Sequence, residues 1–257
     1  MLLEVPESAL RFGFMNDPIG THGSRTMMLK ELTMLLLACP RPTGYEDFRT
    51  AIVDDNVLMK NTLSTRKESF RRLRELYALD EGVLLFRALR DLWEQDPEGQ
   101  PLIALLCVTA RDPILRASAE MILSIPRGET VTPQMIEKTT VVSFPGRYNP
   151  TMRANVGRHA ASTWEQSGHL EGHRHKVRSQ ATATPASTAY ALLLGHLCGN
   201  RGETLFTTLW AQLLDVSISA RHDLAEQAGR MGWLECRHAG EVTESTFDDL
   251  LREGRRS

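Results

Sequence analysis

Cysteine is scarce in this chain of 257 residues, and no two cysteines lie close together in the sequence. The four, Cys39, Cys107, Cys198 and Cys236, stand roughly 40 to 90 residues apart, so none belongs to the CxxC pair of a zinc site. Each has apolar neighbours, which is typical of a buried, reduced thiol. Reduced thiols predict a cytoplasmic protein, because disulfides persist mainly in oxidising compartments.

Long apolar runs are also lacking. The longest, 34–39 and 102–110, are well short of the roughly 20 residues that span a bilayer. The N-terminal stretch 1–20 carries acids and prolines where a signal peptide needs a basic region and a continuous apolar run. We therefore expect no membrane partner.

Sequence motifs of catalysis are missing as well, since the chain has no GxxxxGK[ST], GxSxG or HExxH. Asp54 and Asp55 are adjacent but lack a third carboxylate, and we expect them to end a helix. His169, His173 and His175 follow an HxxxHxH pattern. Three histidines can bind catalytic zinc, but no helix would place these three on one face, and no cysteine is near. The sequence therefore predicts a protein that is not an enzyme, with no catalytic residue, metal or cofactor.

Positive charge is concentrated between residues 60 and 74, although the whole chain has a net charge of -2. This stretch contains six cations and one acid, Glu68. The cations are Lys60, Arg66, Lys67, Arg71, Arg72 and Arg74. A solvated helix face with local ion pairs would explain such a run, but few carboxylates are there to pair with. We therefore interpret the stretch as a candidate DNA-binding surface.

The segment 64–77 is predicted to be an amphipathic helix, with Ser64 or Thr65 as N-cap and Glu68 as capping-box partner. At about 100° per residue, Lys67, Arg71 and Arg74 line a face beside the apolar one. The apolar face consists of Phe70, Leu73, Leu76 and Tyr77. Two predicted helices precede this one, the first stopped near residue 40 and the second over 45–53. Three helices in this order are typical of a helix-turn-helix unit.

The apolar periodicity predicts a mainly α protein of two helical domains, with helix-turn-helix or winged-helix-like units and short β-hairpins. Residues 1–24 form an N-terminal extension that no pattern assigns. Residues 25–145 are predicted to be a helical domain with the helix-turn-helix-like unit. The stretch 143–150, SFPGRYNP, interrupts the periodicity with two prolines and a glycine. Residues 146–257 are therefore predicted to be a winged-helix-like C-terminal domain.

A second basic patch lies between residues 147 and 178, with six Arg or Lys and four His against two Glu. A helix is predicted over 150–166, followed by a strand, a turn and a second strand that includes Val177 and Ala181, as in a winged helix. One face of the helix presents Asn155, Arg158 and Ser162, side chains of the kind that contact bases and phosphates from the major groove. The other candidate DNA-binding residues of this patch are Arg147, Arg153, Arg174, Lys176 and Arg178, the last three at the turn.

The end of the chain repeats the pattern with acidic residues. A helix is predicted over 220–231, Gly232 closes it, and two short strands follow around a turn at Ala239 and Gly240. The acids of this copy are Glu235, Glu241, Glu244, Asp248 and Asp249. Their charge favours packing or protein contact over nucleic acid.

Six segments between residues 24 and 199 share a family resemblance: SRTMMLKELTMLL, DFRTAIVDDNVL, STRKESFRRLRELY, FPGRY, STWEQSGHLEG and TPASTAYALLLGHLCG. They resemble the BrxA family of BREX phage-defence systems, and the resemblance extends over most of the chain beyond the first twenty or so residues. It implies a small, non-enzymatic, mostly helical protein with helix-turn-helix-like parts that binds DNA. It also implies a gene beside those of methyltransferase, ATPase and phosphatase-like components, and no catalytic set to carry over.

We therefore expect a cytoplasmic accessory protein that binds double-stranded DNA in a BREX-type defence system, with other BREX proteins as further candidate partners. Two alternatives remain open. The basic faces could meet acidic surfaces of other defence proteins, which would make the chain a protein-interaction adaptor with little DNA affinity at any salt concentration. The chain could also be an RNA-binding helical scaffold that prefers single strands or A-form duplex.

Overall fold

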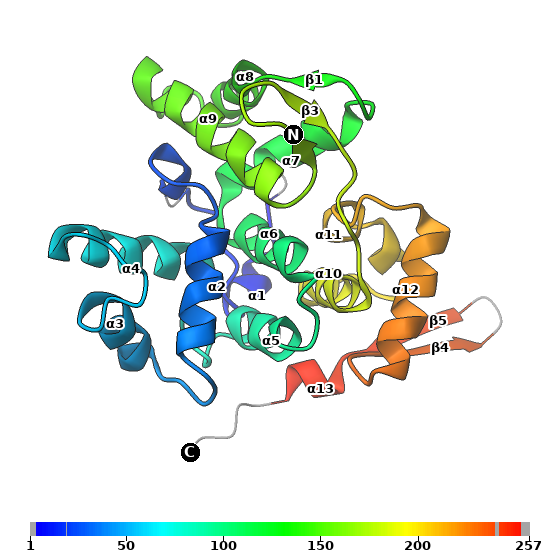
Figure 1. Ribbon diagram of the computed structural model, residues 1–257. Coiled ribbons are helices and arrows are strands. Elements are labelled where there is room, and N and C mark those ends of the chain that lie inside the picture. The colour runs from blue at the N-terminus through cyan, green and yellow to red at the C-terminus, as the bar shows by residue number, and fades with distance from the viewer. Residues whose placement is uncertain (1–3, 19, 240–241, 253–257) are drawn as a thin grey trace.

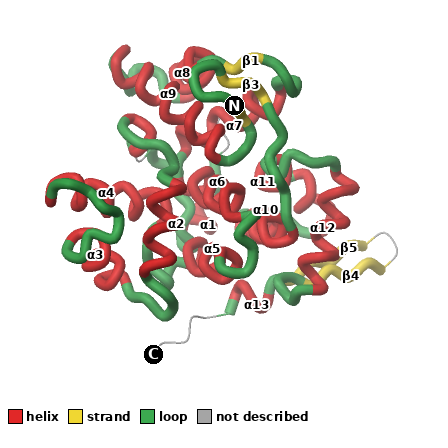
Figure 2. The backbone as a smooth tube through the Cα atoms, viewed as in Figure 1, coloured by secondary structure: helices red, strands yellow, loops and turns green. Residues whose placement is uncertain are grey.

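The computed structural model describes residues 4–18, 20–239 and 242–252, and it describes 236–239 and 242–244 by the backbone only. Helices dominate this part of the chain, and strands occur in two small places (Figure 2). The helical elements up to residue 124 are α1 (Glu7–Leu10), η1 (Thr21–Gly23), α2 (Leu29–Ala38), α3 (Tyr45–Val53), α4 (Leu63–Tyr77), α5 (Leu84–Trp93), α6 (Gln100–Arg111) and α7 (Pro113–Ser124). Those that follow are α8 (Pro133–Ser143), α9 (Pro150–Gln166), α10 (Pro185–Leu197), η2 (Gly202–Thr207), α11 (Leu209–Gln212), α12 (Ile218–Arg230) and α13 (Asp248–Leu251).

Several predicted helix boundaries are confirmed. The predicted helices over 45–53 and 150–166 are α3 and α9, and Asp54 is the C-cap of α3. Asp112 caps α7 by accepting a hydrogen bond from the backbone N–H of Ile114 at 2.9 Å. The predicted N-cap of α4 was wrong: Thr62 is the cap, and its hydroxyl accepts from the N–H of Thr65 at 3.2 Å. Glu68 is instead bound to arginines one turn further along.

A three-stranded antiparallel sheet lies beside α8 and α9. Its strands are β1 (Thr130–Val131), β2 (Leu170–Glu171) and β3 (Lys176–Arg178), and β3 is in the centre, in the order β1-β3-β2. Val177 pairs with Thr130 on one side and Glu171 on the other. The chain therefore runs helix α7, strand β1, helices α8 and α9, and strands β2 and β3. Ala181 was predicted to be in the last strand, but it follows that strand.

The C-terminal hairpin consists of β4 (Glu235–Ala239) and β5 (Val242–Thr246), which pair antiparallel after α12. Gly232, between helix and hairpin, has φ +81°, in the left-handed region where glycine is strongly favoured. The predicted turn residue Gly240, and the side chains of Cys236, Glu241 and Glu244, lie outside the described residues. Cys39 and Cys107 are buried thiols, and Cys198 is half-buried.

One buried core runs across the predicted boundary between residues 145 and 146. The hydroxyl of Tyr190 in α10 donates to the carbonyl of Leu85 at 2.9 Å, and the indole of Trp164 in α9 donates to Ser118 Oγ at 2.9 Å. Figure 1 shows α5, α6 and α10 at the centre of the molecule. The division into two domains therefore stays a prediction. None of the described helices is both long enough and apolar enough to cross a membrane.

The N-terminal residues, which no sequence pattern assigned, are part of this core. Val5, Ala9 and Phe14 are buried, and Thr21 and His22 of η1 have no exposed surface. In Figure 1 the blue η1 segment lies between α9 and α4, and it packs against both.

Candidate nucleic-acid interface

Helix α9 is fixed by its N-cap and by one buried face. Asn149 Oδ1 accepts from the N–H of Met152 at 2.9 Å, and Pro150 supplies the preset φ of the first helical residue. Val156 and Trp164 are fully buried. A Cβ at Gly157 would collide with the carbonyl oxygen of Pro133, so the glycine allows α8 and α9 to pack closely. The opposite face of α9 is left to solvent.

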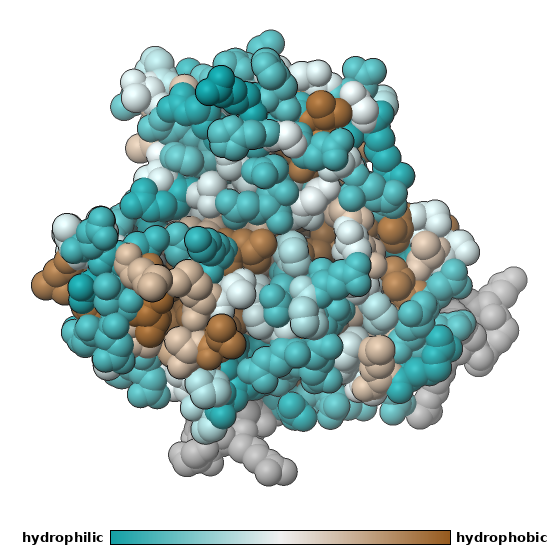
Figure 3. All heavy atoms as spheres, viewed as in Figure 1, coloured by the Kyte–Doolittle hydropathy of each residue, from teal (hydrophilic) through white to brown (hydrophobic). Residues whose placement is uncertain are grey.

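This solvent face carries the predicted polar stripe. Asn155, Arg158 and Ser162 lie at spacings of three and four residues, Arg158 is exposed, and the other two are half-exposed. The Arg158 guanidinium donates to Asn155 Oδ1, which holds the two side chains side by side. Thr151, which sequence reasoning missed, extends the stripe by one turn toward the N-terminus of the helix. On the face shown in Figure 3, the surface over α9 is mostly hydrophilic.

The turn between β2 and β3 exposes Arg174 together with His173 and His175. The described residues place no carboxylate within ion-pair distance of Arg174. His169, the first histidine of the HxxxHxH pattern, is fully buried, and its ring nitrogens contact Ser167 Oγ and the Leu213 carbonyl. Its burial lowers its pKa to about 4. Among the described residues no set of three His, Cys, Asp or Glu could hold a metal ion.

Lys176 and Arg178 require a correction, because they were predicted to bind DNA and are instead buried. Arg178 is 3% exposed and makes a bidentate ion pair with Asp215 at 2.9 and 2.8 Å. Its Nε also donates to the Ile122 carbonyl at 3.0 Å. Lys176 is 8% exposed and bonds Glu165 Oε2 at 3.2 Å. Moving Arg178 to a phosphate would leave Asp215, whose side chain is 10% exposed, without its bidentate partner. Lys176 is itself buried, although Glu165 is partly exposed, so neither cation is presented to solvent.

Arg147 and Arg153 lie on either side of the start of α9. Arg147 is exposed, stacks over the ring of Tyr148, and reaches the carbonyl of Pro18 at 3.4 Å. Arg153 is half-buried, and its Nε donates to the Tyr148 carbonyl at 2.7 Å. Arg147 is therefore accessible to a phosphate, whereas one donor of Arg153 is already used by the turn before the helix.

The basic stripe of α4 is largely paired within its own helix. Arg71 bonds Glu68 at 2.7 Å and Glu75 at 3.3 Å, and Arg72 bonds the same two glutamates at 2.8 and 3.0 Å. The hydrogen bond from Arg71 is the main cause of a lowered pKa at Glu68. Glu75 lies one residue beyond the basic stretch 60–74, which contains only one acid. The helix face with local ion pairs, the alternative explanation of this stretch, is therefore present.

The other candidate cations in and near α4 differ in exposure and in the bonds that they already make. Lys60 bonds Glu31 at 2.9 Å, and Arg66 donates to backbone carbonyls, one of them that of Val53. Arg74 is exposed and donates to the hydroxyl of Tyr45 at 3.0 Å. Lys67 is exposed, with no ion pair to any described residue. Lys67 and Arg74 are therefore the α4 cations most available to a phosphate.

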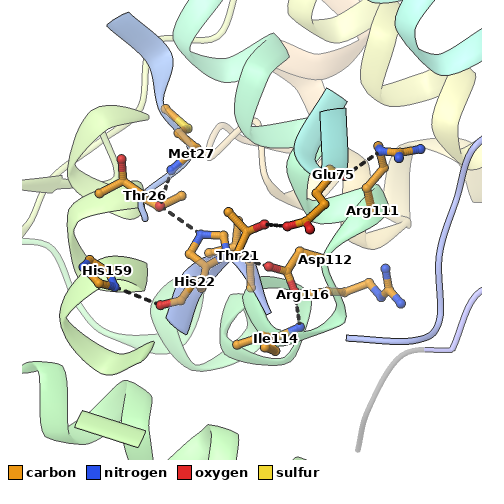
Figure 4. A network of polar contacts seen from close by, with 12 residues as sticks. Thr21, His22, Thr26, Met27, Glu75, Arg111, Asp112, Ile114, Arg116 and His159 are labelled. Carbon is orange, nitrogen blue, oxygen red and sulfur yellow. Dashed lines mark hydrogen bonds and ion pairs between the residues drawn. The ribbon is translucent and has the colours of Figure 1, made fainter. Parts of the chain in front are cut away.

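Sequence reasoning missed a buried polar network that begins at η1 (Figure 4). His22 Nδ1 contacts Asp112 Oδ2 at 2.5 Å, and its Nε2 contacts Thr163 Oγ1 at 3.0 Å. The Thr21 hydroxyl donates to Glu75 of α4 at 2.6 Å. The N-terminal segment thus ties α4, the cap of α7 and α9 together. No local sequence signal marks it, because the partners of His22 lie 90 and 141 residues away.

The hydroxyl, imidazole and carboxylate of Thr163, His22 and Asp112 are arranged as in nucleophilic hydrolases. All three side chains have 0% exposed surface. The Thr163 hydroxyl also accepts from the N–H of Met27 at 2.9 Å, and Asp112 caps α7. The hydrogen bonds of these three buried residues hold η1, the start of α7 and α9 together.

The comparisons with known proteins add no relative. No family model matches the chain, and no curated protein matches it. The similarity to the BrxA family therefore stays a prediction from the quoted segments.

Proposed function

We propose that the protein binds double-stranded DNA through a winged-helix unit made of α7, β1, α8, α9, β2 and β3. The order of these elements and the sheet order β1-β3-β2 support this proposal. In a winged helix the last helix of the unit enters the major groove, and the hairpin contacts the neighbouring backbone. Here α9 would be the recognition helix and the β2–β3 turn the wing.

The observation that carries the proposal is the solvent face of α9, where Asn155 and Arg158 lie together over a fully buried opposite face. Asn pairs with adenine and Arg with guanine in the major groove, and Ser162 can contact either base or phosphate. Arg147, just before α9, and Arg174, in the β2–β3 turn, are exposed and would contact phosphates. Affinity would come mainly from phosphates, with limited base readout.

In this proposal the chain is a cytoplasmic, non-enzymatic accessory protein of a BREX-type defence system. The segments that resemble the BrxA family supply that context. The buried state of the His22 network is in keeping with a binding role rather than a hydrolytic one.

Fluorescence polarisation with labelled duplex DNA, single-stranded DNA and RNA tests the proposal. We expect duplex to bind best, with a log affinity that falls linearly with log salt. Replacing Asn155 and Arg158 by Ala should weaken binding by about 1 to 3 kcal/mol for each base readout removed. Arg230→Ala on α12, which also removes an exposed arginine, is the matched control and should bind as the parent does. Equal binding by the parent and the double variant would remove α9 from the interface.

A second candidate, a protein-interaction adaptor, is favoured by the mixed charge of α4. Glu68 and Glu75 alternate with Arg71 and Arg72 on its surface, and such a pattern suits a partner of mixed charge better than a phosphate backbone. Negligible affinity for every nucleic acid at low salt would favour this function. Tighter binding of A-form RNA than of DNA would favour an RNA scaffold instead.

A further inference from the structure

Helix α9 is flanked along one side by the N-terminal segment. His159 Nδ1 lies 3.0 Å from the carbonyl oxygen of His22, 137 residues earlier in the chain. Gly23 sits so close to the same helix that a Cβ there would be 2.6 Å from Met152 Sδ. Figure 4 shows the His159 ring pointing at this carbonyl. The N-terminal segment is therefore in direct contact with the edge of the α9 stripe.

The hydrogen bond to His22 fixes the tautomer of His159. A carbonyl oxygen can only accept, so Nδ1 must carry the proton. Nε2 is the other ring nitrogen, and no described residue bonds to it. In the neutral ring Nε2 has a lone pair that an anion would repel, whereas in the protonated ring it becomes a charged donor. The same nitrogen therefore changes from unsuitable to suitable for a phosphate when one proton is added.

Two arginines act on His159. Burial is the first cause of its lowered pKa, the hydrogen bond to the His22 backbone acts in the opposite direction, and the charges of Arg158 and Arg25 lower the pKa further. No carboxylate acts on it from the described residues. Arg25 is half-buried and uses one guanidinium N–H on the Ser24 carbonyl at 2.9 Å, which leaves further donors free. Gly23 and Thr26, on either side of Arg25, contact Met152 and Gln166 of α9, and Asn155, one turn before His159, holds the Arg158 guanidinium. Arg25, Arg158 and His159 therefore lie along one stretch of α9, and none of them makes an ion pair with a carboxylate of the described residues.

We infer that Arg25, His159 and Arg158 together bind a backbone phosphate of DNA seated on α9, and that this phosphate is bound together with a proton. The inference rests on the proposed function. The phosphate supplies the negative charge that the site lacks, and His159 takes a proton from solvent onto Nε2 and donates it as a hydrogen bond. DNA binding should therefore strengthen as the pH falls from 8 toward 5.5.

Isothermal titration calorimetry in two buffers of different ionisation enthalpy, at pH 6.5, counts the protons taken up on binding a 20-base-pair duplex. We expect uptake by the parent to fall when His159 is replaced by Asn, whose amide can keep the bond to His22. A His173→Asn, His175→Asn double variant controls for the histidines of the wing and should keep the part of the uptake due to His159. Arg25→Gln should make the slope of log affinity against log salt shallower by roughly 0.9.

The outcomes separate this inference from the proposed function. Absence of duplex binding by the parent at any pH would remove both. Normal binding with equal proton uptake in the parent and His159→Asn would overturn the phosphate site alone, as would an unchanged salt slope in Arg25→Gln. Circular dichroism of each variant checks that the helices are intact.

Discussion

Two regions of the molecule share a backbone design and differ in surface charge. In the first, α9 ends at Ser167 and Gly168 and is followed by β2 and β3. In the second, α12 ends at Met231 and Gly232 and is followed by β4 and β5. Ser167 and Met231 have the same backbone angles, φ -86° and ψ -4°, and the glycines have φ +84° and +81°. A helix, a left-handed glycine and a hairpin thus occur twice.

The solvent faces of the two helices differ in character. Where α9 exposes Arg158 beside Asn155, α12 exposes Asp223 and Glu226, and its exposed Arg230 lies 3.9 Å from Glu226. Backbone geometry alone would suggest two equivalent binding units. The side chains support DNA contact in the first only, so function must be argued from the charge on the helix face rather than from the order of elements.

The two regions are joined at one turn, residues 213–215, just before α12. Arg178 of β3 pairs with Asp215, and His169 contacts the Leu213 carbonyl at 3.0 Å. Arg178, a cation that the sequence assigned to DNA binding, and the buried ring of His169 therefore hold the first region against the second.

The largest expected effect comes from breaking this junction. Arg178→Ala removes the bidentate partner of Asp215 and a donor to three backbone carbonyls, and we expect a loss of about 3 to 5 kcal/mol in the free energy of unfolding. Urea denaturation measures it. Arg127 reaches the same Asp215 from the surface at 3.8 Å with its side chain 54% exposed, so Arg127→Ala should cost about 0 to 1 kcal/mol. Equal losses in the two variants would contradict this account of the junction.

A pH-dependent loss of stability should come from His169, whose pKa of about 4 in the folded chain lies below the ordinary histidine value of 6.5. Between these values the unfolded chain binds the proton and the folded chain does not, so the free energy of unfolding falls as the pH drops. The free energy of unfolding is therefore unaffected by this group above pH 6.5. It decreases by at most about 3 kcal/mol as the pH falls to about 4. Urea denaturation from pH 7 to 4.5 should show a weaker pH dependence in His169→Asn than in the parent. The exposed His173→Asn should match the parent.

Exchanging the charges of α9 and α12 tests which of the two helices contacts DNA. Asn155→Asp with Arg158→Glu gives α9 the charges of α12, and we expect affinity for duplex DNA to drop by about 10 to 100-fold per side chain. Asp223→Asn with Glu226→Arg gives α12 the charges of α9. It should change affinity much less, because α12 lacks the neighbouring Arg25 and His159. Polarisation titrations compare the two; a larger effect from the α12 exchange would reverse the assignment.

The smallest effect is expected on α4. Because Arg71 is already paired with Glu68 and Glu75, replacing Lys67, Arg71 and Arg74 by Ala removes at most two free cations. The slope of log affinity against log salt should become shallower by no more than roughly 1.8. A change of about 2.7 would mean that Arg71 leaves its glutamates on binding. Normal helicity by circular dichroism is required in either case.

Helix positions were predictable because their causes are local. Apolar spacing and the proline-rich interruption at 143–150 marked where helices run, as over 45–53 and 150–166. Strand β1 was missed because two residues carry no periodicity, and it pairs only with Val177 and Lys176, far along the chain. The burial of Lys176 and Arg178 was missed for a related reason: a basic residue in a turn has the same sequence appearance whether a phosphate or Asp215 is its partner.

The candidate interface was predictable only in part. Asn155, Arg158 and Ser162 follow helical spacing, so their common face could be derived from the sequence. The contributions of Arg25 and His159 depend on a tertiary contact to His22, which no spacing rule contains.

Residues 21–27 are synthesised well before the helix against which they pack. Thr163, which contacts His22, is 141 residues further on, and synthesis at about 5 to 20 residues per second needs roughly 7 to 28 s to add them. During this interval a segment destined for the interior is available to chaperones and proteases. The surface of α9 is therefore complete only after η1 has packed against it, which requires that residue 163 has been synthesised.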